Sequence, residues 1–171
     1  SLQERTPPVD WELIVADASS PPYNIRWPLN TLSLPEHPRL GCVRAYNRAF
    51  RQARGKWVVW LNDDCEVQPG WGKAAVDFMT ANPEVGLGAL YWKDLPDRTW
   101  HVNVAYFDVL YANFGIIAKE LGDRLGWFDD DLVMYGCDVS LSYKVWLDDR
   151  GVVGIPASKI LHHRIEDRNR Q

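Results

Sequence analysis

The apolar run from Trp57 to Leu61, followed at once by Asn62, Asp63 and Asp64, most constrains how this chain can fold. Consecutive apolar residues rich in β-branched and aromatic types are typical of a strand covered on both faces. Such strands occur in α/β folds, in which polar ligands bind beyond the carboxyl ends of the strands. The sequence therefore predicts a layered α/β domain with an acidic turn at the ligand-binding edge of its sheet.

The segments around this strand alternate between helical and extended patterns. Apolar residues recur every three or four positions over 41–54, and a second helix is predicted over 71–81. We also expect helices over 119–125 and 138–149, the latter capped by Asp138, and strands over 11–16, 85–90, 99–107 and 152–155. The prolines between residues 21 and 40 disfavour a long helix there but allow a brief strand. This alternation predicts a mixed, mostly parallel sheet flanked by helices.

Composition favours one domain over residues 1–171 and argues against several kinds of partner. The chain is 46% hydrophobic, enough to bury a core, and its net charge of −4 with scattered basic residues disfavours a nucleic-acid binder. No apolar run reaches the roughly 20 residues that cross a bilayer, and no signal peptide is recognisable, so a cytoplasmic location is expected. Cys42, Cys65 and Cys137 are too few and too dispersed for a disulfide framework, and we expect them to be reduced.

The acidic turn carries the oxygen ligands that hard divalent cations prefer. A cation held there would act as a Lewis acid on a departing pyrophosphate, and Asp64 is the candidate ligand. In the alternative interpretation, Asp63 or Asp64 only caps a turn through its own backbone. Spacing alone does not decide between the two.

Four segments resemble, in order and spacing, the motifs of glycosyltransferase family 2. They are ELIVADASS, GCVRAYNRAFRQARGKWVVWLNDDCEVQPGW, GWFDDDLVMYGCDVSLSYKVW and IPASKILHH. The resemblance implies the Rossmann-like GT-A fold and a hexosyltransferase that inverts the anomeric carbon. It implies a nucleoside diphosphate sugar as donor, with UDP-glucose the best single guess, a carbohydrate or other hydroxyl acceptor, and Mn²⁺ or Mg²⁺ as cofactor.

Roles for residues near the acidic turn follow from the same resemblance. Asp17 is expected to contact the nucleotide base, and Arg44 to lie near the base or the diphosphate. Asp63 would bind the ribose, and Asp64 would bind the metal as the last carboxylate of the family's DxD motif. Asn62 stands where many members carry the first Asp, which removes one charge from the nucleotide-sugar site. A turn residue at Asp17 and a surface cation at Arg44 remain the plain alternatives.

The second half of the chain supplies the remaining candidates. Asp138 resembles the family's base, which deprotonates the acceptor hydroxyl, although Cys137 replaces the Glu that usually precedes it. His162 resembles the histidine that completes the metal site, and its nitrogen favours Mn²⁺ over Mg²⁺; His163 is the alternative. Trp127 replaces a Gly of the family's GGFDE segment and is expected to line the sugar or acceptor pocket.

Family members usually begin with a further strand, of the type V-x-V-V-I-P-T-Y-N, which the chain does not contain. The resemblance therefore implies a truncated or minimal GT-A domain, with the strand over 57–61 at the centre of its sheet. An open edge would be left beside it. We expect a partner subunit in a homo-oligomer, or a rearranged segment, to cover this edge.

Other classes of function remain open. A non-catalytic module that binds sugar nucleotides or carbohydrate would keep the donor cleft without an acceptor site. A metal-dependent nucleotidyltransferase would ordinarily need an early Gly-rich or basic phosphate loop, which is absent from the sequence. A structural zinc site would have to draw on histidines without supporting cysteine spacing, namely His37, His101, His162 and His163.

Overall fold

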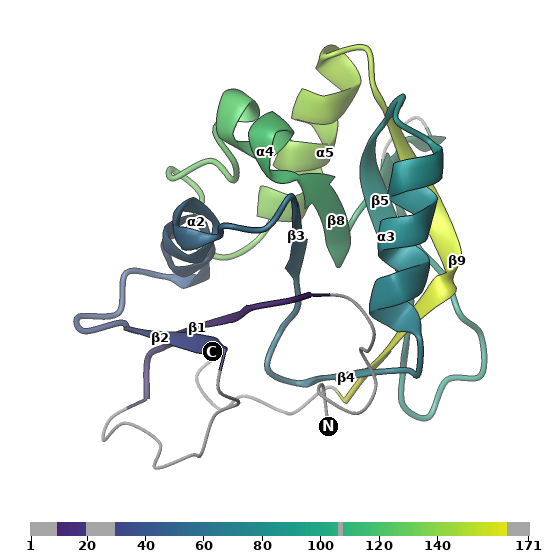
Figure 1. Ribbon diagram of the computed structural model, residues 1–171. Coiled ribbons are helices and arrows are strands. Elements are labelled where there is room, and N and C mark those ends of the chain that lie inside the picture. Colours follow the sequence, from purple (N-terminus) through teal and green to yellow (C-terminus); the bar gives the residue numbers. More distant parts are fainter. Residues whose placement is uncertain (1–9, 20–29, 106–107, 164–171) are drawn as a thin grey trace.

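The computed structural model describes residues 10–19, 30–105 and 108–163. Its centre is a five-stranded sheet in the order β3-β8-β5-β9-β4 (Figure 1). The bounds of these strands are β3 (Trp57–Trp60), β8 (Gly115–Ala118), β5 (Val85–Asp94), β9 (Gly151–His162) and β4 (Cys65–Val67).

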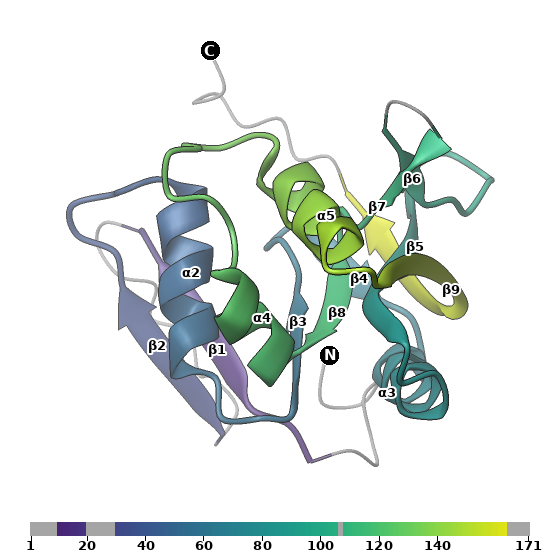
Figure 2. The same ribbon diagram turned by 90° about the horizontal axis from the view of Figure 1, so that it is seen from above.

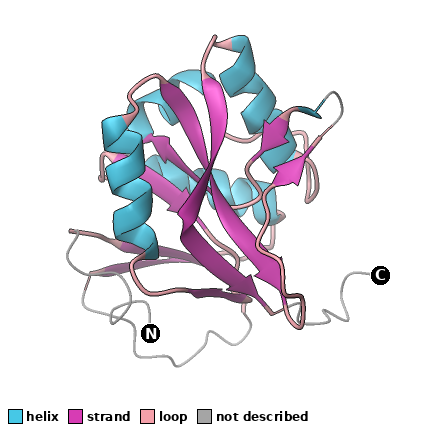
Figure 3. Ribbon diagram, turned by 90° about the vertical axis from the view of Figure 1, so that its right-hand side faces the viewer, coloured by secondary structure: helices cyan, strands magenta, loops and turns pink. Residues whose placement is uncertain are grey.

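Helices cover both faces of this sheet. One face carries α2 (Cys42–Gln52), α4 (Lys119–Leu125) and α5 (Cys137–Leu147), and the other carries α3 (Trp71–Ala81) (Figure 2). A parallel pair of strands, β1 (Leu13–Asp17) and β2 (Thr31–Pro35), lies on the α2 side of the five-stranded sheet. A short antiparallel pair, β6 (Asn103–Val104) and β7 (Leu110–Tyr111), completes the described strands (Figure 3).

Side chains of β3 alternate between two hydrophobic cores. Val58 and Trp60 are buried against α2, α4 and α5, whereas Trp57 and Val59 pack into the core beneath α3. Because successive side chains of a strand point to opposite faces, a wholly apolar strand is needed where both faces are covered. The predicted two-sided burial of this strand is confirmed.

The mixed α/β architecture is confirmed, but the sheet is less parallel than expected. Pairings β3–β8, β5–β8 and β4–β9 are antiparallel, and β5–β9 is parallel. The difference arises because β8, which the sequence did not indicate, inserts between β3 and β5 and runs against both. Within the described residues β3 pairs only with β8, so it lies at an edge of the sheet and not at the centre.

Most helix bounds agree with the periodicity, and α4 spans the predicted residues. The predicted cap of α5 is wrong: Gly136 occupies the N-cap with φ 84°, and Asp138 lies inside the first turn. Glycine adopts this left-handed conformation without steric cost, so the chain enters the helix before Asp138. Strand β9 extends well past the predicted 155, because a bulge around Pro156 absorbs the residue that cannot donate to the ladder.

All three cysteines are free, as the sequence predicts. No helix within the described ranges is long and apolar enough to cross a membrane.

Candidate functional site

The acidic turn connects β3 to β4, and its two carboxylates differ in their exposure to solvent. The N–H of Cys65 donates to the carbonyl of Asn62 at 3.3 Å and closes the turn. Asp64 is 7% exposed, whereas Asn62 and Asp63 are exposed to solvent. Asp64 therefore faces the protein, and Asp63 is available to a ligand approaching from outside.

Asp64 meets two residues from the ends of other strands. Its Oδ2 lies 3.2 Å from Nε2 of His162, the last residue of β9. Nδ1 of His162 lies 2.7 Å from Oδ1 of Asp94, the last residue of β5. Strands β3, β5 and β9 all run in the same direction, so their carboxyl ends meet at one edge of the sheet.

The sequence did not predict Asp94 as a site residue. Its signal was present, because Asp94 pairs in register with His162 across the parallel strands β5 and β9. The strand was expected to end at Leu90, which hid the fact that Asp94 closes it. A longer reading of the apolar run, as far as Trp92, would have placed a second carboxylate at the same sheet edge.

Of the two adjacent histidines, His162 is the one that faces Asp64. Its imidazole is 13% exposed and lies against the ring of Trp92 at 5.7 Å and that of Phe114 at 5.9 Å. The side chain of His163 points elsewhere, with Nε2 3.2 Å from the carboxylate of Glu66, and both side chains are about two-fifths exposed. This geometry favours His162 over His163 as a metal ligand.

The chemistry of Asp64 and His162 fits a divalent cation of the Mn²⁺ type. Within the described ranges, no group of three or more His, Cys, Asp or Glu side chains comes together as a metal site. The pair nevertheless offers one carboxylate oxygen and one imidazole nitrogen side by side. Cations that act on phosphates commonly take only one or two protein carboxylates, with substrate oxygens and water as the other ligands. Imidazole nitrogen favours Mn²⁺ over Mg²⁺ within such a set.

Tyr46, on α2, holds the first residue of the turn. Its hydroxyl lies 2.6 Å from Oδ1 of Asn62 and 3.0 Å from the carbonyl oxygen of Leu61. Burial raises the pKa of Tyr46 well above its usual range, so the hydroxyl keeps its proton and donates. The helix and the end of β3 are thereby joined at the acidic turn.

Asp138 lies in the first turn of α5, half-buried, and its Oδ1 accepts a hydrogen bond from the N–H of Val139 at 2.9 Å. Burial raises the pKa of Asp138. Its neighbour Cys137 is buried, and burial followed by the negative charge of Asp138 raises the pKa of that thiol to about 12. The thiol therefore stays protonated, and the carboxylate of Asp138 is the group beside it that can accept a proton.

The N-termini of α2 and α5 come together around a close contact between Gly41 and the loop before α5. A Cβ on Gly41 would lie 2.8 Å from the carbonyl oxygen of Val133, so only glycine allows this approach. The thiol of Cys42 lies 3.4 Å from the carbonyl oxygen of Met134. Tyr46 packs against the hydrophobic core that contains Cys137, and its hydroxyl contacts Asn62, so this tyrosine joins the acidic turn to the core at the start of α5.

Asp17 ends β1, as predicted, and belongs to a local turn. Its Oδ1 accepts hydrogen bonds from the hydroxyl of Ser19 at 2.5 Å and from the N–H of the same residue at 2.9 Å, and these lower the pKa of Asp17. The nearby His37 lowers it further. Asp17 is therefore ionised and able to accept hydrogen bonds from a ligand.

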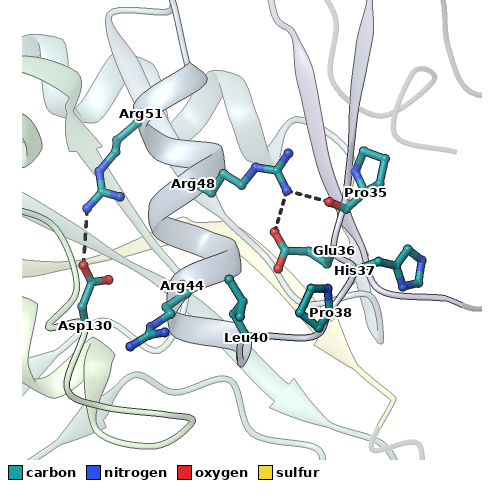
Figure 4. A pocket seen from close by; sticks show the side chains of 9 residues that line it. All are labelled: Pro35, Glu36, His37, Pro38, Leu40, Arg44, Arg48, Arg51 and Asp130. Carbon is teal, nitrogen blue, oxygen red and sulfur yellow. Dashed lines mark hydrogen bonds and ion pairs between the residues drawn. The ribbon is translucent and has the colours of Figure 1, made fainter.

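Arg44 lines a cavity of about 400 Å³ between α2 and the segment after β2 (Figure 4). Two other arginines of α2 share this cavity: Arg48 lies 3.0 Å from Glu36, and Arg51 lies 3.6 Å from Asp130. Residues two positions apart in a helix are separated by about 200° around its axis. Arg44 and Tyr46 therefore leave α2 on opposite sides. The structure does not bring Arg44 to the acidic turn, but the cavity wall includes His37, the neighbour of Asp17.

Trp127 is a core residue, which corrects its predicted role as a sugar contact. The side chain is 2% exposed, and its Nε1 donates to the carboxylate of Asp123 at 2.8 Å. A Cβ on Gly122 would lie 2.3 to 2.5 Å from atoms of the indole. The absence of that Cβ leaves the space into which the indole packs, so it cannot face a ligand.

The family of this chain can be assigned by comparison with known protein families. The family model described as "Glycosyl transferase family 2" matches residues 1–123 of the 171. The chain belongs to glycosyl transferase family 2. No match was found among curated protein sequences.

Several solved structures share the fold of this family 2 chain. A structure of Staphylococcus aureus TarS residues 1–349 with UDP-GlcNAc superposes with a TM-score of 0.66 at 17% identity, covering 82% of this chain and 44% of TarS 1–349. GalNAc-T7 with UDP, GalNAc and Mn²⁺ gives 0.64 at 16% identity, covering 80% and 33%. The mannosyltransferase PcManGT of Pyrobaculum calidifontis with GDP-Man and Mn²⁺ gives 0.59 at 20% identity, covering 82% and 41%.

These neighbours are all longer than the family 2 chain described here. The chain spans between one third and one half of the length of each of the three. At such low identity the superpositions establish a shared GT-A fold. Roles of individual residues in this family 2 chain rest on its own geometry.

Proposed function

We propose that this domain transfers a sugar from a nucleoside diphosphate sugar to an acceptor hydroxyl, with inversion at the anomeric carbon. The observation that carries the proposal is the contact between Asp64 and His162 beside the acidic turn. It supplies an oxygen and a nitrogen ligand at the sheet edge where ligands of α/β folds bind. Neighbours of the same fold were solved with UDP-GlcNAc, or with GDP-Man and Mn²⁺, which supports a donor of this class.

Three aspartates and His162 contribute to donor binding in this proposal. Asp64 and His162 hold a Mn²⁺ or Mg²⁺ ion, which when bound neutralises the charge that develops on the leaving diphosphate. Asp63, exposed beside Asp64, accepts hydrogen bonds from the ribose hydroxyls. Asp17 contacts the base.

Arg44 reaches the base or the diphosphate from the cavity that it lines. The cavity wall includes His37, close to Asp17, and this arrangement supports a binding surface continuous from β1 to α2. UDP is present in the GalNAc-T7 and TarS complexes, so a uridine donor is favoured. UDP-glucose is the first donor sugar to test.

Asp138 is the base. Its carboxylate takes the proton of the acceptor hydroxyl while the acceptor oxygen bonds to the anomeric carbon and the bond to the diphosphate breaks on the opposite face. One such displacement inverts the anomeric carbon. Burial, which raises the pKa of Asp138, makes the ionised carboxylate a stronger proton acceptor.

Release of UDP from UDP-glucose, with Mn²⁺ and a panel of glycan acceptors, tests the proposal. Asp138→Asn should lower the rate of release by at least about a hundredfold, since positioned bases contribute at least that much, and should leave donor affinity intact. Asp149→Asn is the matched control, because it makes the same chemical change at an exposed position beyond the other end of α5.

Two outcomes would count against this proposal. If Asp138→Asn and Asp149→Asn release UDP as fast as the wild-type protein, Asp138 is not the base. If the wild-type protein binds the donor with Mn²⁺ but releases no UDP with any acceptor, the domain is a sugar-nucleotide-binding module instead.

A further inference from the structure

We propose that Asp94 is a positioning residue that presents Nε2 of His162 to the bound cation and thereby favours Mn²⁺ over Mg²⁺. This inference rests on the proposed metal role of Asp64 and His162. In this proposal Asp94 binds neither the donor nor the cation. Its effect passes through the imidazole ring.

The carboxylate of Asp94 determines which nitrogen of His162 carries a proton. Oδ1 of Asp94 lies 2.7 Å from Nδ1 of His162, so the hydrogen bond between them has the N–H of Nδ1 as donor and the carboxylate oxygen as acceptor. That tautomer has its lone pair on Nε2, which lies 3.2 Å from Oδ2 of Asp64, and a cation between these two atoms would take both as ligands. A metal ligand needs that lone pair.

The backbone and the burial of Asp94 make this arrangement rigid. Asp94 is 5% exposed and pairs in register with His162 across β5 and β9. The N–H of Leu95 donates to the carbonyl of His162 at 3.2 Å and ties the two strand ends together. Both ends of the hydrogen bond are therefore held by the sheet.

Aromatic rings limit the rotation of the imidazole. Trp92 stands perpendicular to the ring of His162, with centroids 5.7 Å apart, and Phe114 lies 5.9 Å away. A ring held in this way keeps Nε2 directed at Asp64 when a cation arrives. A carboxylate on the far nitrogen also strengthens the imidazole as a ligand, which matters more for Mn²⁺ than for Mg²⁺.

The neighbouring pair of His163 and Glu66 provides a control for the pair of His162 and Asp94. It also joins a histidine to a carboxylate, at 3.2 Å, but the contact uses Nε2 and both side chains are far more exposed. The pair lies outside the proposed site. Glu66→Gln therefore makes the same chemical change as Asp94→Asn, but at the partner of His163.

The experiment measures Mn²⁺ affinity by the loss of the free-ion electron paramagnetic resonance signal, with UDP present. Asp94→Asn should weaken Mn²⁺ binding by about 10- to 100-fold, because its amide can donate to Nδ1 and stabilise the tautomer protonated on Nε2. Mg²⁺ affinity, measured by competition, should fall less. Glu66→Gln should leave both affinities unchanged.

A double-mutant cycle separates positioning from a general loss of structure. In a His162→Ala background, Asp94→Asn should cause no further loss of Mn²⁺ affinity. Nitrogen-15 spectra of the histidine rings should show Nδ1 protonated in the wild-type protein, and a shift toward protonated Nε2 in Asp94→Asn.

The outcomes distinguish this inference from the proposed function. Wild-type protein that binds Mn²⁺ with UDP, together with an Asp94→Asn variant of equal affinity, overturns the role of Asp94 alone. An equal loss in the wild-type and His162→Ala backgrounds does the same, because Asp94 would then act by another route. Failure of the wild-type protein itself to bind Mn²⁺ overturns both.

Discussion

Burial assigns different roles to the carboxylates around the site. Asp63 is exposed and Asp64 is buried, although they are adjacent in the sequence. Asp138 is half-buried in the first turn of α5, and burial raises its pKa. The position of each side chain relative to solvent thus distinguishes the proposed ribose contact Asp63, the proposed metal ligand Asp64 and the proposed base Asp138.

The raised pKa of Asp138 predicts a pH dependence of turnover. A protonated carboxyl cannot accept the proton of the acceptor, so kcat/KM should fall as the pH drops through a pKa above the ordinary 3.8 of aspartate. The measurement is a pH profile of kcat/KM, with Mn²⁺ affinity determined at each pH so that loss of the cation is accounted for. If kcat/KM keeps its maximal value down to about pH 4 while the cation stays bound, burial does not raise the pKa of the base.

Single residues also show which contacts can be predicted from the sequence. Asp64 and His162 were predicted as a metal pair from their resemblance to family motifs, and the structure brings their side chains into contact. Trp127 is predicted to line a ligand pocket from its place in the segment that resembles the family's GGFDE. Its burial depends on the missing side chain of Gly122, and nothing in the local sequence reveals that contact.

At the scale of elements, local and non-local signals differ in what they reveal. The helices α2, α3 and α4 were predicted because their apolar periodicity is contained within each segment. The strand β8 has four residues, and its place between β3 and β5 depends on distant parts of the chain. Asp94 and His162 are 68 residues apart and meet only because β5 and β9 pair in parallel.

The packing of Trp127 in the turn after α4 predicts that its substitution lowers stability without changing donor binding. Gly126 ends the helix with φ 80°, and the chain folds the indole of Trp127 back over Gly122 and against Phe50 at 4.6 Å. Trp127→Phe should lower the free energy of unfolding by about 2 kcal/mol, since it leaves a cavity and removes the hydrogen bond to Asp123. UDP affinity should not change.

Chemical denaturation and calorimetric titration with UDP measure these two quantities. If Trp127→Phe instead unfolds with the same free energy as the wild-type protein but binds UDP more weakly, Trp127 contacts the ligand and is not only a core residue. Asp149→Asn is again a suitable control, since it alters an exposed residue far in sequence from this turn.

At the scale of the whole molecule, two cores hold the sheet between helices and set the position of the site. Val58 and Ile117 pack against α2, α4 and α5, while Val59 and Ile116 pack toward α3. The sheet is thereby held from both faces, and the carboxyl ends of β3, β5 and β9 emerge together along one edge. The acidic turn, Asp94 and His162 lie along that edge, so the fold itself assembles the proposed cation site.

Anomalous diffraction at the manganese edge, from crystals grown with Mn²⁺ and UDP, tests this account most directly. The account predicts one manganese peak within bonding distance of a carboxylate oxygen of Asp64 and of Nε2 of His162, about 2.1 to 2.3 Å from each, with diphosphate oxygens completing the coordination. UDP bound with manganese at another place, or with none at Asp64 and His162, would contradict it.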